Sequence, residues 1–126
     1  VDDIERLGDH TVTFANLCRV KSRRQIAFSP FAYEELSVIE RLITENLRDA
    51  AALIERHDLE KIRNINRRED DVDLKVKEAR ERHLVRFHRR ICPAEAGPIY
   101  VEMLIHLERI SDHCQNIAEY VEDLAD

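Results

Sequence analysis

The stretch Leu107-Glu-Arg-Ile-Ser-Asp-His113 has a near copy at the other end of the chain, Ile4-Glu-Arg-Leu-Gly-Asp-His10. Both copies contain the pattern E-R-x-x-D-H, and Ala15 matches Ala118 at the same offset of 103 residues. Sequence repeats at a fixed offset usually reflect duplicated structural units. We therefore expect the first helix to be the last helix of one repeat, in a chain that begins part-way through a longer protein. The rest of the chain would form one complete repeat of three helices.

The composition favours a bundle of long helices. The chain has 126 residues, of which 37% are charged, and only two glycines and three prolines interrupt it. Such a chain is typical of amphipathic helices packed around one core. The net charge of −6 argues against a nucleic-acid-binding module, which usually carries a basic excess. Cys18, Cys92 and Cys114 form no C-x-x-C motif, so we expect three reduced thiols.

Local start and stop signals divide the chain into helices. Ser29-Pro30 combines an N-cap residue with a proline at the first helical position, and Asp58 is placed to cap the next helix after a very short turn. Residues 92–98 contain two prolines and a glycine, which makes them the clearest break. Short connections favour antiparallel neighbours, so the predicted fold class is an all-α, up-and-down antiparallel helix bundle. The predicted helices cover about residues 1–24, 30–57, 58–90 and 95–124 of a single domain, 1–126.

Each copy of the motif carries two carboxylates four residues apart. On a helix, Glu108 and Asp112 stand almost opposite the apolar positions around Ile110, and Glu5 and Asp9 stand in the same relation to the apolar residues of their own helix. One interpretation is a solvated helical face. The other is a cation site, because carboxylates at this spacing repel each other slightly unless a cation lies between them. This geometry predicts that any such site lies on the surface of the bundle.

Glu69 interrupts an apolar stripe between Ile65 and Val72, and Asp73 follows four residues later. Burying a carboxylate costs several kcal/mol unless it is paired or coordinated. Two alternatives stay open from the sequence. Glu69 either pairs with an arginine, such as Arg67 or Arg68 or another across the bundle, or it binds a metal ion.

Two stretches, Glu69-x-x-x-Asp73 and Glu108-Arg-Ile-Ser-Asp-His-Cys-Gln-Asn-Ile-Ala-Glu119, together resemble the PhoU family of phosphate-transport regulators. Ser29-Pro-Phe-Ala-Tyr-Glu-Glu-Leu36 is similar to the start of the first helix of a family repeat. Cys92-Pro-Ala-Glu-Ala-Gly-Pro-Ile-Tyr100 resembles more specifically the PhoU-like domain at the cytoplasmic C-terminus of bacterial sodium–phosphate cotransporter (Na/Pi cotransporter) proteins. The resemblance covers essentially the whole chain and is most specific near its end.

The resemblance implies a repeat of three helices, normally present twice, that binds metal ions such as iron or zinc through paired E/D-x-x-x-D motifs. Glu5 and Asp9 would be half of a second, incomplete metal site, although Thr13 departs from the pattern because it stands where the later copy has Asn116. His10, His113 and Asn116 are candidate groups around the ligands. Carried over by position, the complete metal site would use Glu69, Asp73, Glu108 and Asp112.

The resemblance also implies a regulatory function without catalysis. The domain would be cytoplasmic, tethered to the inner membrane as part of a transporter, with a membrane transporter domain or a phosphate-signalling protein as its partner. A ferritin-type oxidase is disfavoured because no Glu has a His three residues later. A metal-free helical interaction module is the alternative, and the arginine-rich stretch 80–90 would then be a solvated face or meet an acidic partner. We further expect self-association, because uncovered apolar surface favours contact with a partner.

Overall fold

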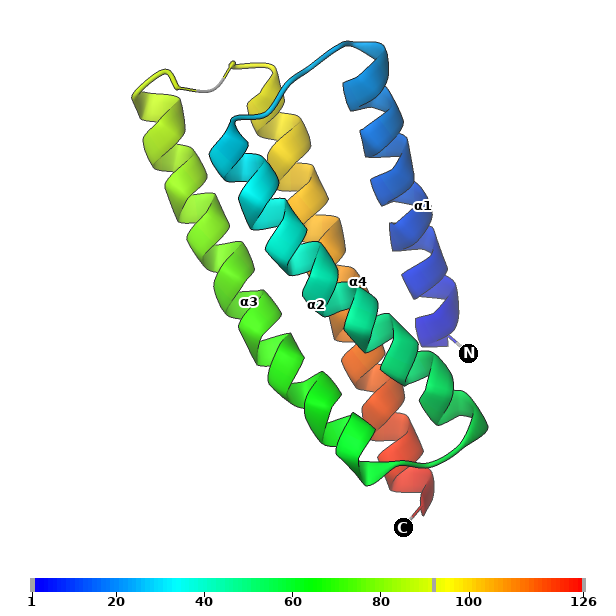
Figure 1. Ribbon diagram of the computed structural model, residues 1–126. Coiled ribbons are helices and arrows are strands. Elements are labelled where there is room, and N and C mark those ends of the chain that lie inside the picture. Colours follow the sequence, from blue (N-terminus) through cyan, green and yellow to red (C-terminus); the bar gives the residue numbers. More distant parts are fainter. Residues whose placement is uncertain (1, 92, 126) are drawn as a thin grey trace.

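The computed structural model describes residues 2–91 and 93–125, which form four helices (Figure 1). They are α1 (Asp2–Arg23), α2 (Pro30–Glu55), α3 (Leu59–His88) and α4 (Ala96–Ala125). These bounds lie within three residues of the predicted ones. The parts of the predictions that concern Val1 and Cys92 lie outside the described residues.

The helix ends follow from local chemistry. The Ser29 hydroxyl accepts a hydrogen bond from the backbone N–H of Ala32 at 3.2 Å, and Pro30 stands in the first turn, as predicted. A carboxylate oxygen of Asp58 accepts hydrogen bonds from the N–H groups of Glu60 and Lys61. The turn between α2 and α3 is therefore only three residues long, and it makes these two helices antiparallel neighbours.

Helix α4 is the central element of the bundle. It packs against each of the other three helices, and α2 and α3 also pack against each other. Its buried positions therefore cover a wide arc that includes neighbours in sequence, such as Met103 with Leu104 and Ile110 with Ser111. The fold is the expected all-α bundle, in which α2, α3 and α4 form a three-helix unit and α1 lies along the outside of α4 (Figure 1).

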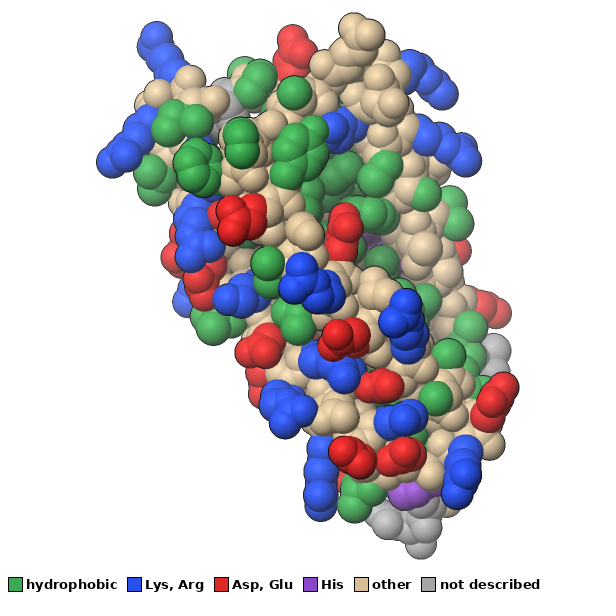
Figure 2. All heavy atoms as spheres, viewed as in Figure 1, with side chains coloured by type: hydrophobic (Ala, Val, Ile, Leu, Met, Phe, Trp, Pro, Cys, Tyr) green, Lys and Arg blue, Asp and Glu red, His purple; other side chains and the backbone are tan. Residues whose placement is uncertain are grey.

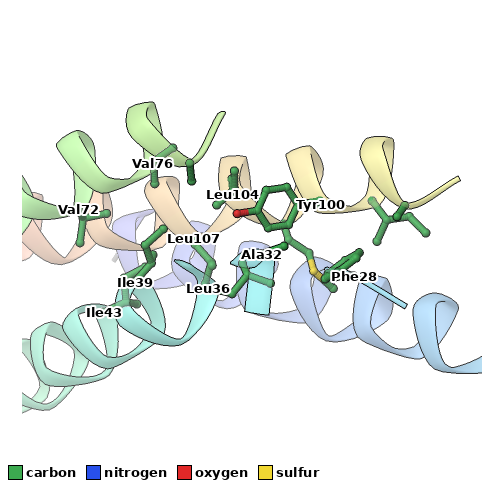
Figure 3. Packing of buried hydrophobic residues seen from close by; sticks show 14 of the residues in the cluster. Phe28, Ala32, Leu36, Ile39, Ile43, Val72, Val76, Tyr100, Leu104 and Leu107 are labelled. Carbon is green, nitrogen blue, oxygen red and sulfur yellow. The ribbon is translucent and has the colours of Figure 1, made fainter. Parts of the chain in front are cut away.

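The core fills the space between α2, α3 and α4. In Figure 3, side chains of α2, including Leu36 and Ile39, point toward Val76 of α3 and Leu104 of α4. Burial of apolar side chains of this size stabilises the fold by about 1.5–3 kcal/mol each. A second buried cluster continues the core toward the turn between α2 and α3 and includes Ile65.

Helix α1 is attached differently from the others. Consecutive antiparallel helices were expected to pack together, but α1 packs against α4 and makes no comparable contact with α2 or α3. No described residue of α1 is buried, and its contribution to the core is limited to half-buried side chains such as Leu7 and Phe14. Residues 24–29 connect α1 to α2. We therefore describe α1 as an added helix on the three-helix unit that α2, α3 and α4 form.

The surface carries charges of both signs. Figure 2 shows acidic and basic side chains interspersed over the lower part of the visible face, with apolar side chains gathered toward the upper end. None of the four helices carries an apolar stretch long enough to cross a membrane.

Candidate metal centre

Carboxylates from α3 and α4 come together at the seam between these two helices. Glu69, Asp73 and Asp112 each place one carboxylate oxygen within 4.8 Å of the others. Glu69 and Asp73 are one turn apart on α3, and Asp112 lies on the facing side of α4. Glu108, one turn before Asp112, interacts with Asp73 and is half-buried. The structure therefore brings together all four side chains that the resemblance assigned to one site, and we call them the acidic cluster.

The acidic cluster extends from the surface to the edge of the core. The side chains of Asp73 and Asp112 are exposed, whereas Glu69 is only 2% exposed. Glu69 is buried, as its place in an apolar stripe indicated, and Asp112 lies at the surface, as expected. The expected surface position is wrong for Glu108, which is half-buried. The reason is that α4 is covered by three helices, so a position opposite one apolar side chain still meets the neighbouring helix α3.

The arginine alternative for Glu69 is also wrong. Arg68 points to α2, where its guanidinium lies 2.6 Å from the Asp49 carboxylate and 3.1 Å from that of Glu45. Arg67 donates a hydrogen bond to Asn64 on its own helix. In residues 2–91 and 93–125, no Lys, Arg or His forms an ion pair within 4.0 Å of any acidic-cluster carboxylate. The buried carboxylate thus has no cationic side chain as its partner.

A buried polar chain holds Glu69 in place. The Ser111 hydroxyl donates a hydrogen bond to the Glu69 carboxylate, and Asn46 donates to the Ser111 oxygen at 3.5 Å. The Asn46 carbonyl accepts from Arg68 at 3.2 Å. Sequence reasoning missed Asn46 and Ser111. Asn46 was detectable, because it is a polar residue at a core position of α2 between Ile43 and Ala50.

The electrostatics favour uptake of positive charge. Burial, and after it the neighbouring Asp112, raises the pKa of Glu69 to about 9. Burial, and after it the charge of other acidic-cluster carboxylates, also raises the pKa values of Asp73 and Glu108. Neighbouring carboxylates with raised pKa values repel one another when they ionise. Either protonation or a bound metal cation removes this repulsion. Oxygen-only ligands suit hard or borderline ions such as iron, manganese, magnesium or calcium.

The second copy of the motif has different surroundings. Glu5 and Asp9 lie exposed on α1, and in the part of the chain that the structure describes no further acidic, His or Cys side chains gather with them as they do at the acidic cluster. The structure thus gives the two copies of the motif different surroundings, and the incomplete metal site at Glu5 and Asp9 stays a prediction.

The histidines of the two motifs lie on the other seam, between α1 and α4. His113 interacts with Asp3 at 3.0 Å, and Asn116 donates to the same carboxylate at 3.2 Å. His10 interacts with His106, which sequence reasoning did not select. Burial lowers the pKa of His10, and the neighbouring His106 and His113 lower it further. Their expected place around the acidic cluster stays a prediction, since the described contacts of these side chains join α1 to α4.

Comparison with protein-family models matches residues 36–121 to the PhoU domain. The chain belongs to the PhoU domain family. The match covers most of α2, all of α3 and most of α4, and so includes the entire acidic cluster. No curated protein and no solved structure matches the chain.

Membership in the PhoU domain family assigns the chain a regulatory role in phosphate homeostasis. The family is regulatory and non-enzymatic. Two free cysteines lie in the described residues: Cys18 is exposed, and Cys114 is buried, which raises the pKa of its thiol to about 12. The prediction for Cys92 lies outside the described residues.

Proposed function

We propose that this PhoU domain is a metal-binding regulatory module of phosphate transport, acting on or attached to a sodium–phosphate cotransporter. The observation that supports metal binding is the acidic cluster itself: a carboxylate that is 2% exposed, surrounded by carboxylates and without a cationic side chain. The ion would be iron, zinc or a similar metal.

Glu69, Asp73, Glu108 and Asp112 would hold the ion between α3 and α4. A bound cation supplies positive charge that offsets the mutual repulsion of these carboxylates and their burial. Ser111 orients the inner carboxylate through its hydrogen bond. The exposed Asp73 and Asp112 would present the site to solvent and to a partner, because they form its outer edge.

The domain would act from the cytoplasmic side, tethered to the inner membrane through a transporter. This part of the proposal is supported by the likeness of residues 92–100 to the C-terminal domain of sodium–phosphate cotransporters. The partner would be the transporter domain or a phosphate-signalling protein.

Elemental analysis of untagged protein tests metal binding. The Asp73→Asn, Asp112→Asn double variant should lose the metal that co-purifies with the unchanged protein. A matched control is Glu5→Gln with Asp9→Asn, which alters the same motif on α1 and should keep the metal. Equal metal content in all three proteins would contradict the assignment of the acidic cluster.

Phosphate uptake by cells that carry these three versions tests regulation. We expect the α3–α4 variant to change the sodium-dependent uptake rate and the α1 control to leave it unchanged. A change confined to sodium-independent uptake would remove the cotransporter from the proposal while keeping a role in phosphate transport.

A metal-free interaction module is the alternative function. Exposed apolar side chains at one end of the bundle favour it, notably Phe31, Val85 and Ile91, which line a groove of about 810 Å³ between α2 and α3. Under this alternative the acidic-cluster variants would behave like the unchanged protein in both assays.

A further inference from the structure

A row of ionisable side chains crosses the α1–α4 seam. His106 of α4 is followed along the seam by His10 of α1, then by His113 of α4 and Asp3 of α1. The Nδ1 atoms of His10 and His106 are 2.9 Å apart, and the rings of His10 and His113 are stacked with centroids 5.5 Å apart. Residues 96 positions apart in sequence are thus brought into direct contact.

We propose that His10 and His106 form a second metal site, which binds a borderline divalent transition-metal ion through their two Nδ1 atoms and links α1 to α4. Imidazole nitrogen is a preferred ligand of Zn²⁺, Ni²⁺ and Cu²⁺. This site differs from the acidic cluster in its ligands, in the helices that it joins and in the metals that it selects.

The separation of the two nitrogens fits ligation of one ion. At a metal–nitrogen distance of about 2.1 Å, two nitrogens 2.9 Å apart subtend roughly a right angle at the ion. Neighbouring positions of square-planar or octahedral sites have this angle, so the separation of the two nitrogens suits Ni²⁺ or Cu²⁺. Tetrahedral Zn²⁺ requires the rings to separate by about 0.5 Å.

The surroundings of the two rings resemble the shell of a metal site. The Glu102 carboxylate lies 3.6 Å from Nε2 of His106, the nitrogen that faces away from His10. Metal-bound histidines usually direct this second nitrogen toward a carboxylate, which fixes the ring and increases its basicity. His113, held at 3.0 Å by Asp3, stacks against His10 and restricts its ring in turn. The remaining ligands would be water molecules, because the His106 side chain is still 15% exposed.

Such a link would control how firmly α1 is attached. No described residue of α1 is buried, and although Lys21 reaches the Tyr33 ring of α2, the backbone of α1 packs closely only against α4. An ion that binds only the docked arrangement shifts the equilibrium toward it, by a factor of about 100 when its concentration is 100 times its Kd. Occupancy of the histidine site would therefore govern the position of one whole helix.

The test uses untagged protein in which Asp73→Asn and Asp112→Asn replace two of the four acidic-cluster carboxylates, so that metal binding at the acidic cluster is weakened and binding by the histidines is measured. Calorimetry with Ni²⁺ should give one equivalent of binding. His10→Ala and His106→Ala should each weaken binding at least tenfold, whereas His57→Ala, an exposed histidine beyond α2, should have no effect. Circular dichroism checks that each variant remains helical.

Cu²⁺ electron paramagnetic resonance provides a second measurement that needs no histidine variant. Splitting by nitrogen nuclei is expected in the protein that keeps both histidines, and amide hydrogen exchange in α1 should slow when Ni²⁺ is added. The proposal is overturned by an absence of saturable Ni²⁺ binding, by a Cu²⁺ spectrum without nitrogen splitting, or by binding that both histidine substitutions leave unchanged.

Discussion

Ser111 donates a hydrogen bond to Glu69, and both side chains are buried where α3 meets α4. This single contact connects the polar interior of the bundle to the acidic cluster at its surface. It explains how a carboxylate can occupy a core position. One carboxylate oxygen accepts a hydrogen bond from a neutral donor, and the remaining negative charge is compensated by a proton or by a metal cation.

The stability of the domain should depend on pH. In protein freed of metal by a chelator, the free energy of unfolding should fall as pH rises from about 4.5, the ordinary pKa of Glu69, toward its folded value of about 9. Within this window the folded state binds more protons than the unfolded state, because burial raises the carboxyl pKa, and stability therefore decreases with pH. Urea unfolding at several pH values measures the slope.

Glu69→Gln should remove most of this slope, since the amide does not titrate. Some slope should remain, because the pKa values of Asp73 and Glu108 are raised as well. Glu81→Gln, an exposed change on the same helix, is the control and should preserve the full slope. A slope that is identical in the unchanged protein and in Glu69→Gln would contradict the assigned protonation.

Ser111→Ala should destabilise the domain by about 1–3 kcal/mol. The substitution removes the donor to Glu69 and the acceptor for Asn46, so that buried polar groups on α3 and α2 lose their partner. Ser37→Ala, on the exposed face of α2, should change the free energy of unfolding by less than about 0.5 kcal/mol. Equal effects of the two substitutions would show that the buried chain has no structural role.

A second buried network lies near the other end of the bundle. Arg86 donates to Glu35 at 2.8 and 3.2 Å, and the Tyr100 hydroxyl donates to Glu35 at 2.6 Å. We expect Tyr100→Phe to cost about 1.5–3 kcal/mol, the range for a hydrogen bond to a charged group. Arg86→Met should cost about 3–5 kcal/mol, because it leaves the Glu35 carboxylate without its cation.

Thermal or urea unfolding of both variants tests this order, with Arg89→Met as an exposed control that should be nearly neutral. In a double-mutant cycle the two losses should not add, since both changes act on the same carboxylate. Additive losses would mean that Tyr100 and Arg86 stabilise the fold independently.

The features of this structure that the sequence predicts are those that depend on interactions between residues close together along the chain. The helix bounds were predictable because Ser29, Pro30 and Asp58 act on groups within three residues of themselves. The packing of α1 against α4 was not, because it depends on contacts between opposite ends of the chain. His10 was singled out as a motif residue, but its partner His106 lies outside the motif.

The same distinction between local and long-range interactions applies to the acidic cluster. Glu69 and Asp73 were found because a carboxylate in an apolar stripe is visible in one helix, and the motif supplied Glu108 and Asp112. The interpretation of Arg68 was wrong because a residue next to Glu69 in sequence points about 100° away around the helix, here toward α2. Ser111 gave no signal, since a serine inside a polar motif is expected at the surface and only the coverage of α4 by three helices buries it.

Helix α1 should exchange its amide hydrogens faster than the other helices. It has no buried residue among those described and its backbone packs closely only against α4, so its opening costs less than the opening of the three-helix unit. Mass-spectrometric hydrogen exchange without added metal should show early labelling of residues 2–23 and late labelling around Leu104 in α4. Equal protection of α1 and α4 would contradict the description of α1 as an added helix.

We expect the domain to self-associate, and we expect the groove between α2 and α3 to form the contact between the two copies. Phe31 is 60% exposed and Val85 is 51% exposed at this groove, near the end of the bundle where Figure 2 shows apolar side chains gathered. The groove also carries both signs of charge, with basic residues such as Arg82 and Arg89 beside acidic residues such as Glu34. A surface with both signs is able to complement its own copy across a two-fold axis.

Sedimentation velocity at increasing protein concentration measures this association. The unchanged protein should show a dimer that becomes more abundant with concentration, and Phe31→Ser with Val85→Ser should shift it to monomer. Leu74→Ser, which removes an equally exposed apolar side chain elsewhere on α3, should leave the dimer intact. A protein that stays monomeric at the highest concentration would refute self-association, and a dimer that persists in the double variant would place the contact on another face, such as the exposed side of α1.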